Sequence, residues 1–390
     1  MGKATWGMPE VKAMLGGWAG PRTPADARES LSRALGQLGY GDGLFLVSRG
    51  SLALRLALDE MRVQRPARGV VAVPAYCCPS VPDTVRDMGL SVRAAPVLPD
   101  LNLDLSRLPG LLGPDVLAVV GVHMYALPLD MARLKAITDA TGAYLIDDAA
   151  HVVGNGRKPP GTAGAAGLLS FNQSKTLTGG SPNGGGVLIV GDEQLRRGIA
   201  ARYAALREGV SRARNYIWFV LRFGIERTPR ALLEYLHPFD EPLPMVLGVN
   251  SKIAERMSAS ACLVVAEQLK RLREIVDGRT RVVAHYIEAL RANPVLSFVQ
   301  GSEPRYLSRV LVRWNEGPPA DQVRERLLKR GFAARLPYPL WTSPDDPTAG
   351  EIVRINATHL ELPASPRLTS AEIDELVSAV TLCVNSAAAK

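Results

Sequence analysis

The sequence predicts an α/β protein, with a large N-terminal α/β domain and a small C-terminal α+β domain. Between about residues 43 and 190, short runs rich in β-branched residues alternate with segments of helical periodicity. This alternation is typical of buried strands with helices on both faces of the sheet. The chain has 390 residues, of which 47% are apolar and 22% charged. That length is too great for one small core and suits two domains.

Six apolar runs are the predicted strands of the large domain. They are Leu44–Val47, Val70–Val73, Val116–Val120, Tyr144–Ile146, Leu168–Phe171 and Val187–Val190. Apolar residues at helical spacing lie between several of these runs, for example Met131, Leu134 and Thr138. Strands and helices in this order predict a sheet built from strand–helix–strand units.

The remainder of the chain follows other patterns. Residues 198–248 are rich in Arg, aromatic residues and Pro, which indicates an irregular excursion rather than a separate domain. An amphipathic helix is expected from about Ala254 to Leu290, with a break near Gly278. An alternating run at Tyr306–Trp314 predicts a strand, a helix should cover Asp321–Lys329, and a last helix should begin with Ser370 as its N-cap. The predicted division is an N-terminal arm (1–25), a large domain (26–265) and a small domain (266–390).

Charge and cysteine content limit the possible partners and compartments. The formal net charge is +8, which suits anionic partners such as nucleotide diphosphates, nucleic acid or acidic membranes. The sequence contains no run of three or more consecutive basic residues and no zinc-type Cys/His spacing, so nucleic-acid binding is a minor alternative. Four cysteines without a disulfide framework and no secretory signal predict a cytoplasmic location. The aromatic stretch 216–221 is too short to span a bilayer.

A first cluster of polar residues follows the strand at Tyr144–Ile146. Two carboxylates come at its end, and the run reads Asp147-Asp148-Ala149-Ala150-His151. Ligands of open α/β sheets bind beyond the carboxyl ends of the strands, so these acids lie where chemistry is expected. The alternative is that an Asp simply caps a following helix.

A second cluster surrounds a single lysine. The strand ending at Ser170 and Phe171 is followed by Lys175 in a polar loop, and glycines 184–186 precede the next strand. A lysine in a partly dry cleft can lose its proton and attack an aldehyde. The alternative is an ordinary solvated lysine, but the position between two buried strands favours a functional one.

A third cluster follows the first strand, where Gly50-Ser51-Leu52 open a helix. Free backbone N–H groups and a hydroxyl at a helix N-terminus can hold a phosphate, although a simple turn has the same sequence features. Neither a Walker loop nor a G-x-G-x-x-G motif is present. A phosphate cradle, a carboxylate and a lysine in this chain order are what a pyridoxal 5′-phosphate (PLP) site requires.

The order of these motifs resembles the DegT/StrS family of PLP-dependent sugar aminotransferases. The resemblance rests on Gly50-Ser51, Asp148-Ala149-Ala150-His151, Ser170-Phe171 with Lys175, and Gly185-Gly186, and extends over about residues 25–385. It implies PLP fold type I (aspartate aminotransferase-like), with a seven-stranded mixed sheet in the large domain. It also implies a homodimer with active sites at the interface.

The resemblance implies specific roles at the site. Lys175 would form the Schiff base with PLP, and Asp148 would pair with its pyridine nitrogen. Ala150 would pack on one face of the ring, and His151 would reach the ring hydroxyl, where many relatives have Gln. The phosphate would be held at the helix start by Gly50, Ser51 and Leu52, together with Ser170.

Several positions depart from the family's pattern. The family usually places an aromatic residue on the cofactor four residues after Pro74, where this chain has Cys78. Tyr76, two residues earlier, is therefore an alternative stacking residue. The Asn that reaches the partner subunit's phosphate has no clean match, and Asn250 is only a candidate. The run Asp147-Asp148-Ala149-Ala150 and the Pro-Ala-Tyr-x-Cys-Pro pattern suggest a divergent branch associated with surface-polysaccharide genes.

The predicted function is transfer of an amino group, from glutamate as the expected donor, to a nucleotide-linked keto-sugar for surface-polysaccharide or glycosylated-metabolite synthesis. Two alternatives stay open. One is other PLP chemistry on the same scaffold, such as elimination, decarboxylation or C–C bond formation, which the altered stacking position allows. The other is a non-catalytic sensor or scaffold, which the presence of both Lys175 and Asp148 disfavours. Contact of residues 216–223 with a membrane is a further minor alternative.

Overall fold

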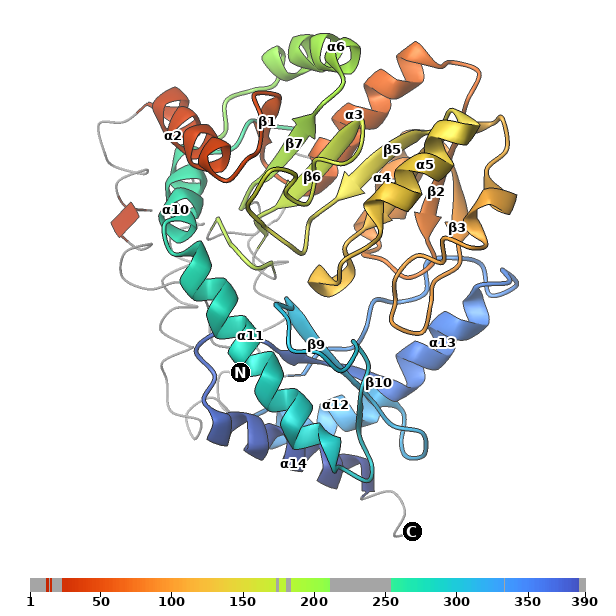
Figure 1. Ribbon diagram of the computed structural model, residues 1–390, viewed down its shortest axis with the longest axis vertical. Helices are drawn as coiled ribbons and strands as arrows, with labels where there is room; N and C mark the ends of the chain where they lie inside the picture. Colours follow the sequence, from red (N-terminus) through yellow and green to blue (C-terminus); the bar gives the residue numbers. More distant parts are fainter. Residues whose placement is uncertain are drawn as a thin grey trace.

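The computed structural model describes residues 12, 13, 15, 23–172, 175–179, 184–210, 254–332 and 334–385. Within these residues the chain forms a seven-stranded sheet and a separate three-stranded sheet. Figure 1 shows the large sheet and its helices in the upper half, with the C-terminal elements below. The α/β class and the mixed sheet of seven strands are confirmed.

The large sheet contains all six predicted strands and one further strand. They are β1 (Leu44–Val47), β2 (Val70–Pro74), β3 (Ser91–Ala95), β4 (Val116–Val122), β5 (Tyr144–Asp148), β6 (Ala166–Ser170) and β7 (Gly186–Val190), in the order β1-β7-β6-β5-β4-β2-β3. Strand β7 is antiparallel to both neighbours, and the other pairs are parallel. The sequence did not predict β3 because this edge strand is partly exposed and carries Ser91 and Arg93 among small residues.

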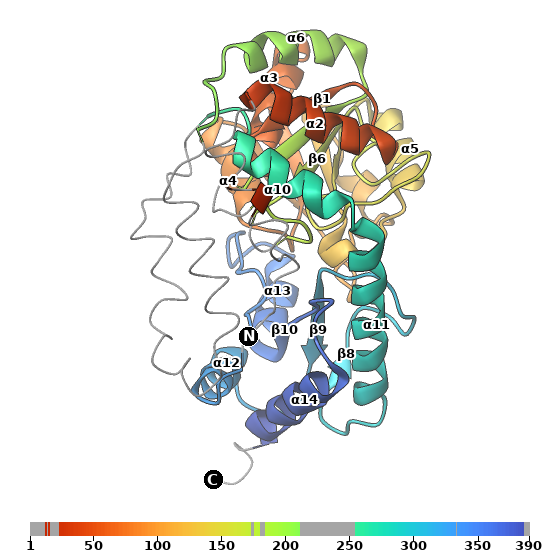
Figure 2. The same cartoon turned by 90° about the vertical axis from the view of Figure 1, so that its left-hand side faces the viewer.

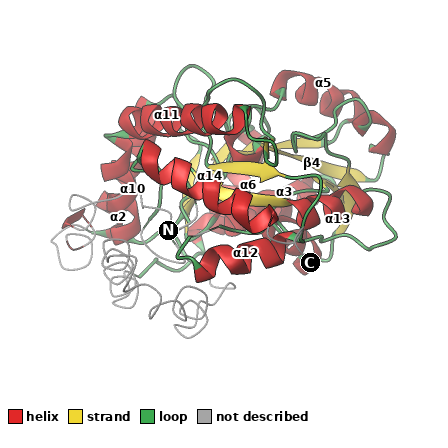
Figure 3. Ribbon diagram, turned by 90° about the horizontal axis from the view of Figure 1, so that it is seen from below, coloured by secondary structure: helices red, strands yellow, loops and turns green. Residues whose placement is uncertain are grey.

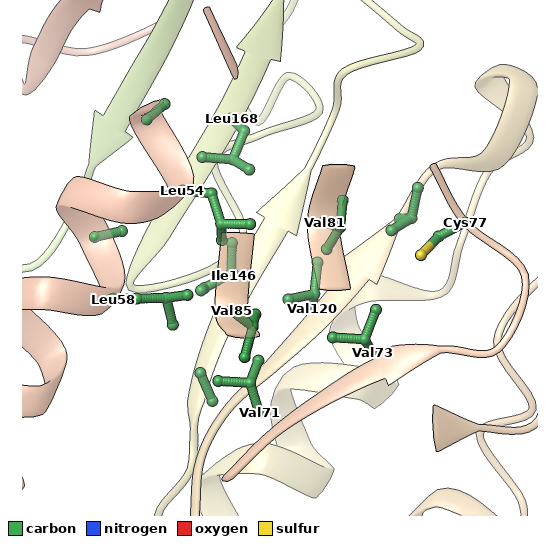
Figure 4. Packing of buried hydrophobic residues seen from close by; sticks show 14 of the residues in the cluster. Leu54, Leu58, Val71, Val73, Cys77, Val81, Val85, Val120, Ile146 and Leu168 are labelled. Carbon is green, nitrogen blue, oxygen red and sulfur yellow. The ribbon is translucent and has the colours of Figure 1, made fainter. Parts of the chain in front are cut away.

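Helices cover both faces of this sheet, as predicted. They are α2 (Pro24–Gln37), α3 (Gly50–Gln64), α4 (Ser80–Asp87), α5 (Met131–Thr141), α6 (Glu193–Ala204) and α10 (Ala259–Leu269). Successive residues of a strand point to opposite faces, so Ile146 packs in the cluster with α3 and α4 (Figure 4), whereas Leu145 packs with α5. On the second face, α2 and α10 lie side by side (Figure 2).

The C-terminal elements form the smaller sheet and its helices. They are α11 (Leu272–Arg291), β8 (Ser297–Phe298), β9 (Arg309–Arg313), α12 (Ala320–Lys329), α13 (Ala349–Thr358), β10 (His359–Pro363) and α14 (Ser370–Asn385). The antiparallel order is β10-β9-β8, and α14 lies between α11 and α12 (Figure 3). Residues of α11 up to Ile275 pack in the cluster of α2 and α10, and those from Val282 pack with the small sheet. The domain division at 265/266 stays a prediction.

Three details of the sequence interpretation are wrong. The helix expected from Ala254 to Leu290 is two helices, α10, capped by Ser258, and α11, separated at Lys270 and Arg271 rather than at Gly278. Gly278 lies inside α11, where a Cβ would come within 2.6 Å of the Cβ of Pro366. This close packing, and not a break, explains the glycine.

The other two errors concern the last elements of the chain. The expected strand Tyr306–Trp314 shortens to β9, because residues before Arg309 form a turn that contacts the large sheet's end. The last helix is capped by Thr369 rather than Ser370, since the Thr369 Oγ1 accepts from the backbone N–H of Glu372, and the Glu372 carboxylate accepts from that of Thr369. This pair is a capping box shifted by one residue. None of the helices in the described ranges is long and apolar enough to cross a membrane.

Candidate active site

The predicted site residues meet at one edge of the large sheet. Strands β1, β2, β4, β5 and β6 run in the same direction, because β1 and β6 are both antiparallel to β7 and the others follow in parallel. Their carboxyl ends therefore share an edge. The segments after β1, β2, β5 and β6 carry the residues predicted from the three motifs, which explains how positions 120 residues apart come together.

Lys175 lies in the connection between β6 and β7. Its backbone N–H donates to the carbonyl of Asn172 at 2.9 Å, and its Nζ lies 3.1 Å from His151 Nε2. Partial burial lowers the pKa of Lys175. The adjacent Thr176 donates to the carbonyl of His151 at 3.1 Å. Lys175 is therefore held against the end of β5 and is more easily deprotonated than a solvated lysine.

Asp148 is the last residue of β5 and is 4% exposed. Its Oδ1 accepts from the backbone N–H of Ala150 at 2.9 Å. Burial raises the pKa of Asp148, opposed by this hydrogen bond and by the charge of Lys175. No helix follows β5 directly, so the alternative that Asp148 caps a helix is excluded. Asp148 forms no ion pair with any residue that the structure describes, and such a buried carboxylate would favour binding of a cationic ligand group.

Asp147, by contrast, has its partners within the protein. Its carboxylate lies 3.0 Å from His123 Nε2 and accepts from the backbone N–H groups of Gly161 and Ala163 at 2.9 and 3.0 Å. The side chain is 1% exposed. Asp147 therefore holds the loop after β5 in place, and of the two neighbouring carboxylates it is Asp148 that is left for a ligand.

His151 is contacted by two residues that the sequence reasoning missed. Its Nδ1 lies 3.2 Å from Ser308 Oγ, and its Nε2 lies 3.3 Å from the hydroxyl of Tyr338. Burial lowers the pKa of His151, so the imidazole is neutral near neutral pH. Ser308 and Tyr338 belong to the C-terminal elements and carry no motif of their own. They lie close to His151 because the two sheets pack together, and no local sequence pattern predicts that packing.

The helix start after β1 is the segment predicted to hold the phosphate, the predicted phosphate cradle. A Cβ at Gly50 would lie 3.2 Å from Ser170 Cβ and 3.4 Å from its Oγ, so α3 approaches the end of β6 closely at this glycine and a side chain there would crowd Ser170. Ser51 is partly exposed, whereas Leu52 packs in the core, so only its backbone faces this region. The adjacent Arg49 has a buried Nε without a hydrogen-bond partner.

The cradle also depends on Gly186, the first residue of β7. A Cβ there would lie 2.6 Å from the carbonyl carbon of Arg49 and from the nitrogen of Gly50. We expect Gly186→Ala to displace the start of α3 and to raise the dissociation constant of PLP by about tenfold or more, about 1.4 kcal/mol. Titration of the cofactor-free variant with PLP measures this. Gly191→Ala, whose Cβ would meet only one atom at 3.7 Å, is the matched control, and equal affinities of the two variants would contradict the expectation.

Tyr76 and Cys78, the two alternatives for the stacking position, lie in different surroundings. Tyr76 is 1% exposed; its hydroxyl lies 2.5 Å from that of Tyr125 and accepts from the backbone N–H of Tyr338 at 3.2 Å. Cys78 is partly exposed, with its Sγ 3.1 Å from Ser80 Oγ. Tyr76 is thus fixed by buried hydrogen bonds to its neighbours, and Cys78 is the more exposed residue of the two.

A buried carboxylate of the small sheet, that of Glu361, contacts Tyr125. Glu361 in β10 is 7% exposed, accepts a short hydrogen bond from Tyr125 and lies 4.0 Å from Arg309 Nε. Burial raises the pKa of Glu361. Tyr125 and Ala126 have φ angles of 53° and 72°, a left-handed backbone that persists only where contacts enforce it. A charge inside the apolar run Leu360–Pro363 was the available sequence signal for Glu361.

Two further predictions fall on residues outside the described ranges. Asn250, the candidate for the partner's phosphate, lies there, as does the aromatic stretch 216–223.

The described residues fit PLP. Gly50 and the Ser170 hydroxyl approach each other at a helix N-terminus, which suits a phosphate. Asp148, buried and in no ion pair with a described residue, suits a protonated ring nitrogen, and Lys175 has the lowered pKa that an amine needs to attack an aldehyde.

The chain is similar to known proteins over nearly its whole length. The sequence pattern of the DegT/DnrJ/EryC1/StrS aminotransferase family matches residues 39–381. GDP-perosamine synthase of Caulobacter vibrioides is 28% identical over 355 residues, 85% of this chain and 83% of that protein. L-glutamine:2-deoxy-scyllo-inosose aminotransferase of Streptomyces kanamyceticus is 36% identical over 158 residues, 38% of this chain and 35% of that protein. A Streptococcus pneumoniae protein solved in its PLP form shares the fold, with a TM-score of 0.73 at 15% identity over 99% and 98% of the two chains.

Proposed function

This chain belongs to the DegT/DnrJ/EryC1/StrS family of PLP-dependent aminotransferases, and we propose that it transfers an amino group from glutamate to a nucleotide-linked keto-sugar. The observation that carries the proposal is the position of Lys175 Nζ, 3.1 Å from His151 and beside the buried Asp148 at the carboxyl ends of the strands. The similarity to GDP-perosamine synthase over 85% of the chain supports a nucleotide sugar as the acceptor.

The residues at this edge would divide the binding of PLP among them. Lys175 would hold the cofactor covalently, and Asp148 would keep the ring nitrogen protonated. Ala150 and Cys78 would face the ring, and His151 would reach its hydroxyl. The phosphate would bind at the first turn of α3, between Gly50-Ser51 and Ser170, and Asn250 of a second copy stays a candidate for the same group.

PLP, when bound, supplies a conjugated ring that accepts the electron pair released at the donor's α-carbon. The protein's own residues would then control the protons. The Nζ of Lys175, when it does not hold the cofactor, would act as the base that takes the donor's α-proton and as the acid that gives it back. The buried carboxylate of Asp148 would favour electron flow into the ring by stabilising the charge on its nitrogen through a charge-assisted hydrogen bond.

Arg309 is the cation that we propose for a carboxylate of the donor. Its side chain is 18% exposed, and its Nε lies 4.0 Å from Glu361 Oε2, longer than a paired guanidinium contact. Its charge also acts on the pKa values of Lys175 and His151. An incompletely paired guanidinium beside the lysine can bind a carboxylate by two parallel hydrogen bonds.

A second candidate is amination of an inosose with glutamine as the donor. The observation that favours it is the identity of 36% with an L-glutamine:2-deoxy-scyllo-inosose aminotransferase, over 158 residues. The two candidates share the cofactor and the lysine and differ in both substrates. A homodimer with shared sites remains part of the leading proposal.

The visible absorbance of the PLP-loaded enzyme, before and after addition of an amino donor, tests the half-reaction. We expect glutamate to bleach the violet-region band of the lysine-bound cofactor and D-glutamate to leave it unchanged. Arg309→Met should require about tenfold more glutamate for the same bleaching, since it removes a charged hydrogen bond of about 1.5 kcal/mol. Bleaching by glutamine alone would favour the inosose reaction. A band that neither donor changes would contradict both candidates.

A further inference from the structure

A short turn in the C-terminal part contacts three segments of the site. In this turn, residues 306–308 before β9, the Tyr306 hydroxyl donates to Thr176 Oγ1 at 2.5 Å. Ser308 Oγ lies 3.2 Å from His151 Nδ1, and the Ser308 N–H donates to the Tyr125 carbonyl at 2.9 Å. The turn therefore touches the neighbour of Lys175, the imidazole next to it and the strained loop after β4.

Arg279 of α11 holds the backbone of this turn through hydrogen bonds. Its Nη1 donates to the carbonyls of Leu307 and Ser308, at 3.4 and 3.1 Å. The side chain is 6% exposed, and burial lowers the pKa of Arg279 to about 10, which leaves the guanidinium charged at neutral pH. A charged donor to two carbonyls restrains the backbone on either side of the Ser308 side chain.

The donors around His151 determine which ring nitrogen carries the proton. Lys175 Nζ and the Tyr338 hydroxyl both approach Nε2, at 3.1 and 3.3 Å. Burial raises the pKa of Tyr338, so its hydroxyl keeps its proton and can donate. When Lys175 is protonated, its ammonium group can only donate. Nε2 must then be the acceptor, and in a neutral imidazole the proton lies on Nδ1, facing Ser308 Oγ.

We propose that Ser308 is a positioning residue of the amino-transfer site, which holds His151 as the Nδ1–H tautomer so that the Nε2 lone pair faces Lys175 Nζ. The hydroxyl oxygen of Ser308 accepts from Nδ1–H, and the Arg279-held turn keeps this oxygen in place. In the other tautomer an N–H at Nε2 would face the N–H groups of an ammonium. A serine of the C-terminal part would thereby influence the pKa of Lys175, which lies between β6 and β7 of the large sheet.

Several other charged or titratable groups face Lys175 and stay unchanged in the test. They are Asp148 at the end of β5, Cys78 after β2, Arg309 in β9 and Glu361 in β10, and the Tyr338 hydroxyl lies at His151 Nε2. Because all of these groups are also present in a Ser308 variant, a change in the pKa of Lys175 in that variant is attributed to the altered tautomer of His151. The inference rests on the proposed function only in taking Lys175 as the reactive lysine; the tautomer of His151 does not depend on it.

Nitrogen NMR of the cofactor-free enzyme labelled with ¹⁵N-histidine measures the tautomer directly. The chain has five histidines, and the His151→Gln variant assigns the signals of His151. We expect the Nδ1–H pattern in the wild type and in Ser308→Thr, which keeps a hydroxyl. Ser308→Ala should change it to Nε2–H, because a buried N–H without an acceptor costs about 1–3 kcal/mol. An Nε2–H wild type, or an unchanged Ser308→Ala, would overturn the proposal.

The pH dependence of Lys175 acetylation in the cofactor-free enzyme, followed by mass spectrometry, measures the consequence. Loss of the acceptor at Nε2 should lower the apparent pKa of Lys175 by about one unit, a roughly tenfold change in its reactive fraction at fixed pH. Ser308→Thr and the exposed-site control Ser302→Ala should match the wild type. If the pH dependence of Lys175 acetylation were the same in all variants, the tautomer of His151 would not influence the pKa of Lys175, and this part of the proposal would be contradicted. Turnover by Lys175→Ala would instead refute the proposed function and leave the NMR result standing.

Discussion

We expect the Lys175→Ala enzyme to lose amino transfer almost completely, with kcat lower by at least about four orders of magnitude. The variant removes both the amine that would hold PLP and the base that would move the α-proton, and no other lysine is within reach of His151 Nε2 in the described hydrogen bonds. The side chain is partly exposed, so its loss should leave the fold intact. Steady-state assays with donor and acceptor measure the effect.

Two controls separate chemistry from folding in this experiment. Lys158→Ala removes an exposed lysine from the loop after β5 and should keep full activity. Addition of a small primary amine should restore part of the activity of Lys175→Ala, because the amine can take the place of Nζ as a base. Activity within tenfold of the wild type in Lys175→Ala would refute the assignment of this lysine.

Asp148→Asn should lower kcat by about 10³-fold, about 4 kcal/mol of transition-state stabilisation. An amide is neutral and cannot keep the ring nitrogen protonated, although its oxygen can still accept from the Ala150 N–H that now bonds Asp148 at 2.9 Å. The change should therefore affect catalysis much more than the binding of PLP. Comparison of kcat with the dissociation constant of PLP tests this, and equal losses in both would contradict the role.

The stability of the cofactor-free Asp148→Asn variant should change in the opposite direction. Burial raises the pKa of Asp148 above its unfolded value. Such a group contributes stability below its unfolded pKa, and this contribution is lost as the pH rises through the folded pKa. At neutral pH the carboxylate therefore weakens the cofactor-free fold, and removal of its charge should not lower the melting temperature.

Asp147→Asn is the matched comparison. The carboxylate uses both oxygens, since Oδ2 accepts from Gly161 N–H and Ala163 N–H and Oδ1 lies 3.0 Å from His123 Nε2, whereas an amide has only one acceptor oxygen for the two sides. The free energy of unfolding should fall by about 2–4 kcal/mol. If Asp147→Asn instead lost only activity and Asp148→Asn lost only stability, the two carboxylates would have been assigned the wrong way round.

The sequence predicted those elements of the fold that have a recognisable local pattern of apolar residues. Buried parallel strands such as β4 are continuous apolar runs, and the motifs around Gly50, Asp148 and Lys175 follow strands whose ends must meet at one edge. The edge strand β3 has no such run. The break between α10 and α11 at Arg271 has neither Gly nor Pro, so nothing local marks it.

The contribution of the C-terminal part to the site could not be predicted in the same way. Ser308 and Tyr338 are ordinary residues in their own segments, and each contacts His151 only because the two sheets pack together. The choice between Tyr76 and Cys78 likewise depends on packing, since the buried hydrogen bonds of Tyr76 form with Tyr125 and the Tyr338 backbone.

Borohydride reduction of the PLP-loaded enzyme, followed by peptide mass spectrometry, tests the central claim most directly. The reduction makes the bond between PLP and its lysine permanent, so the modified peptide identifies the residue. We expect the label on Lys175, and no label in the Lys175→Ala variant. A label on another lysine, or none in a wild-type enzyme that turns over, would contradict the site proposed here.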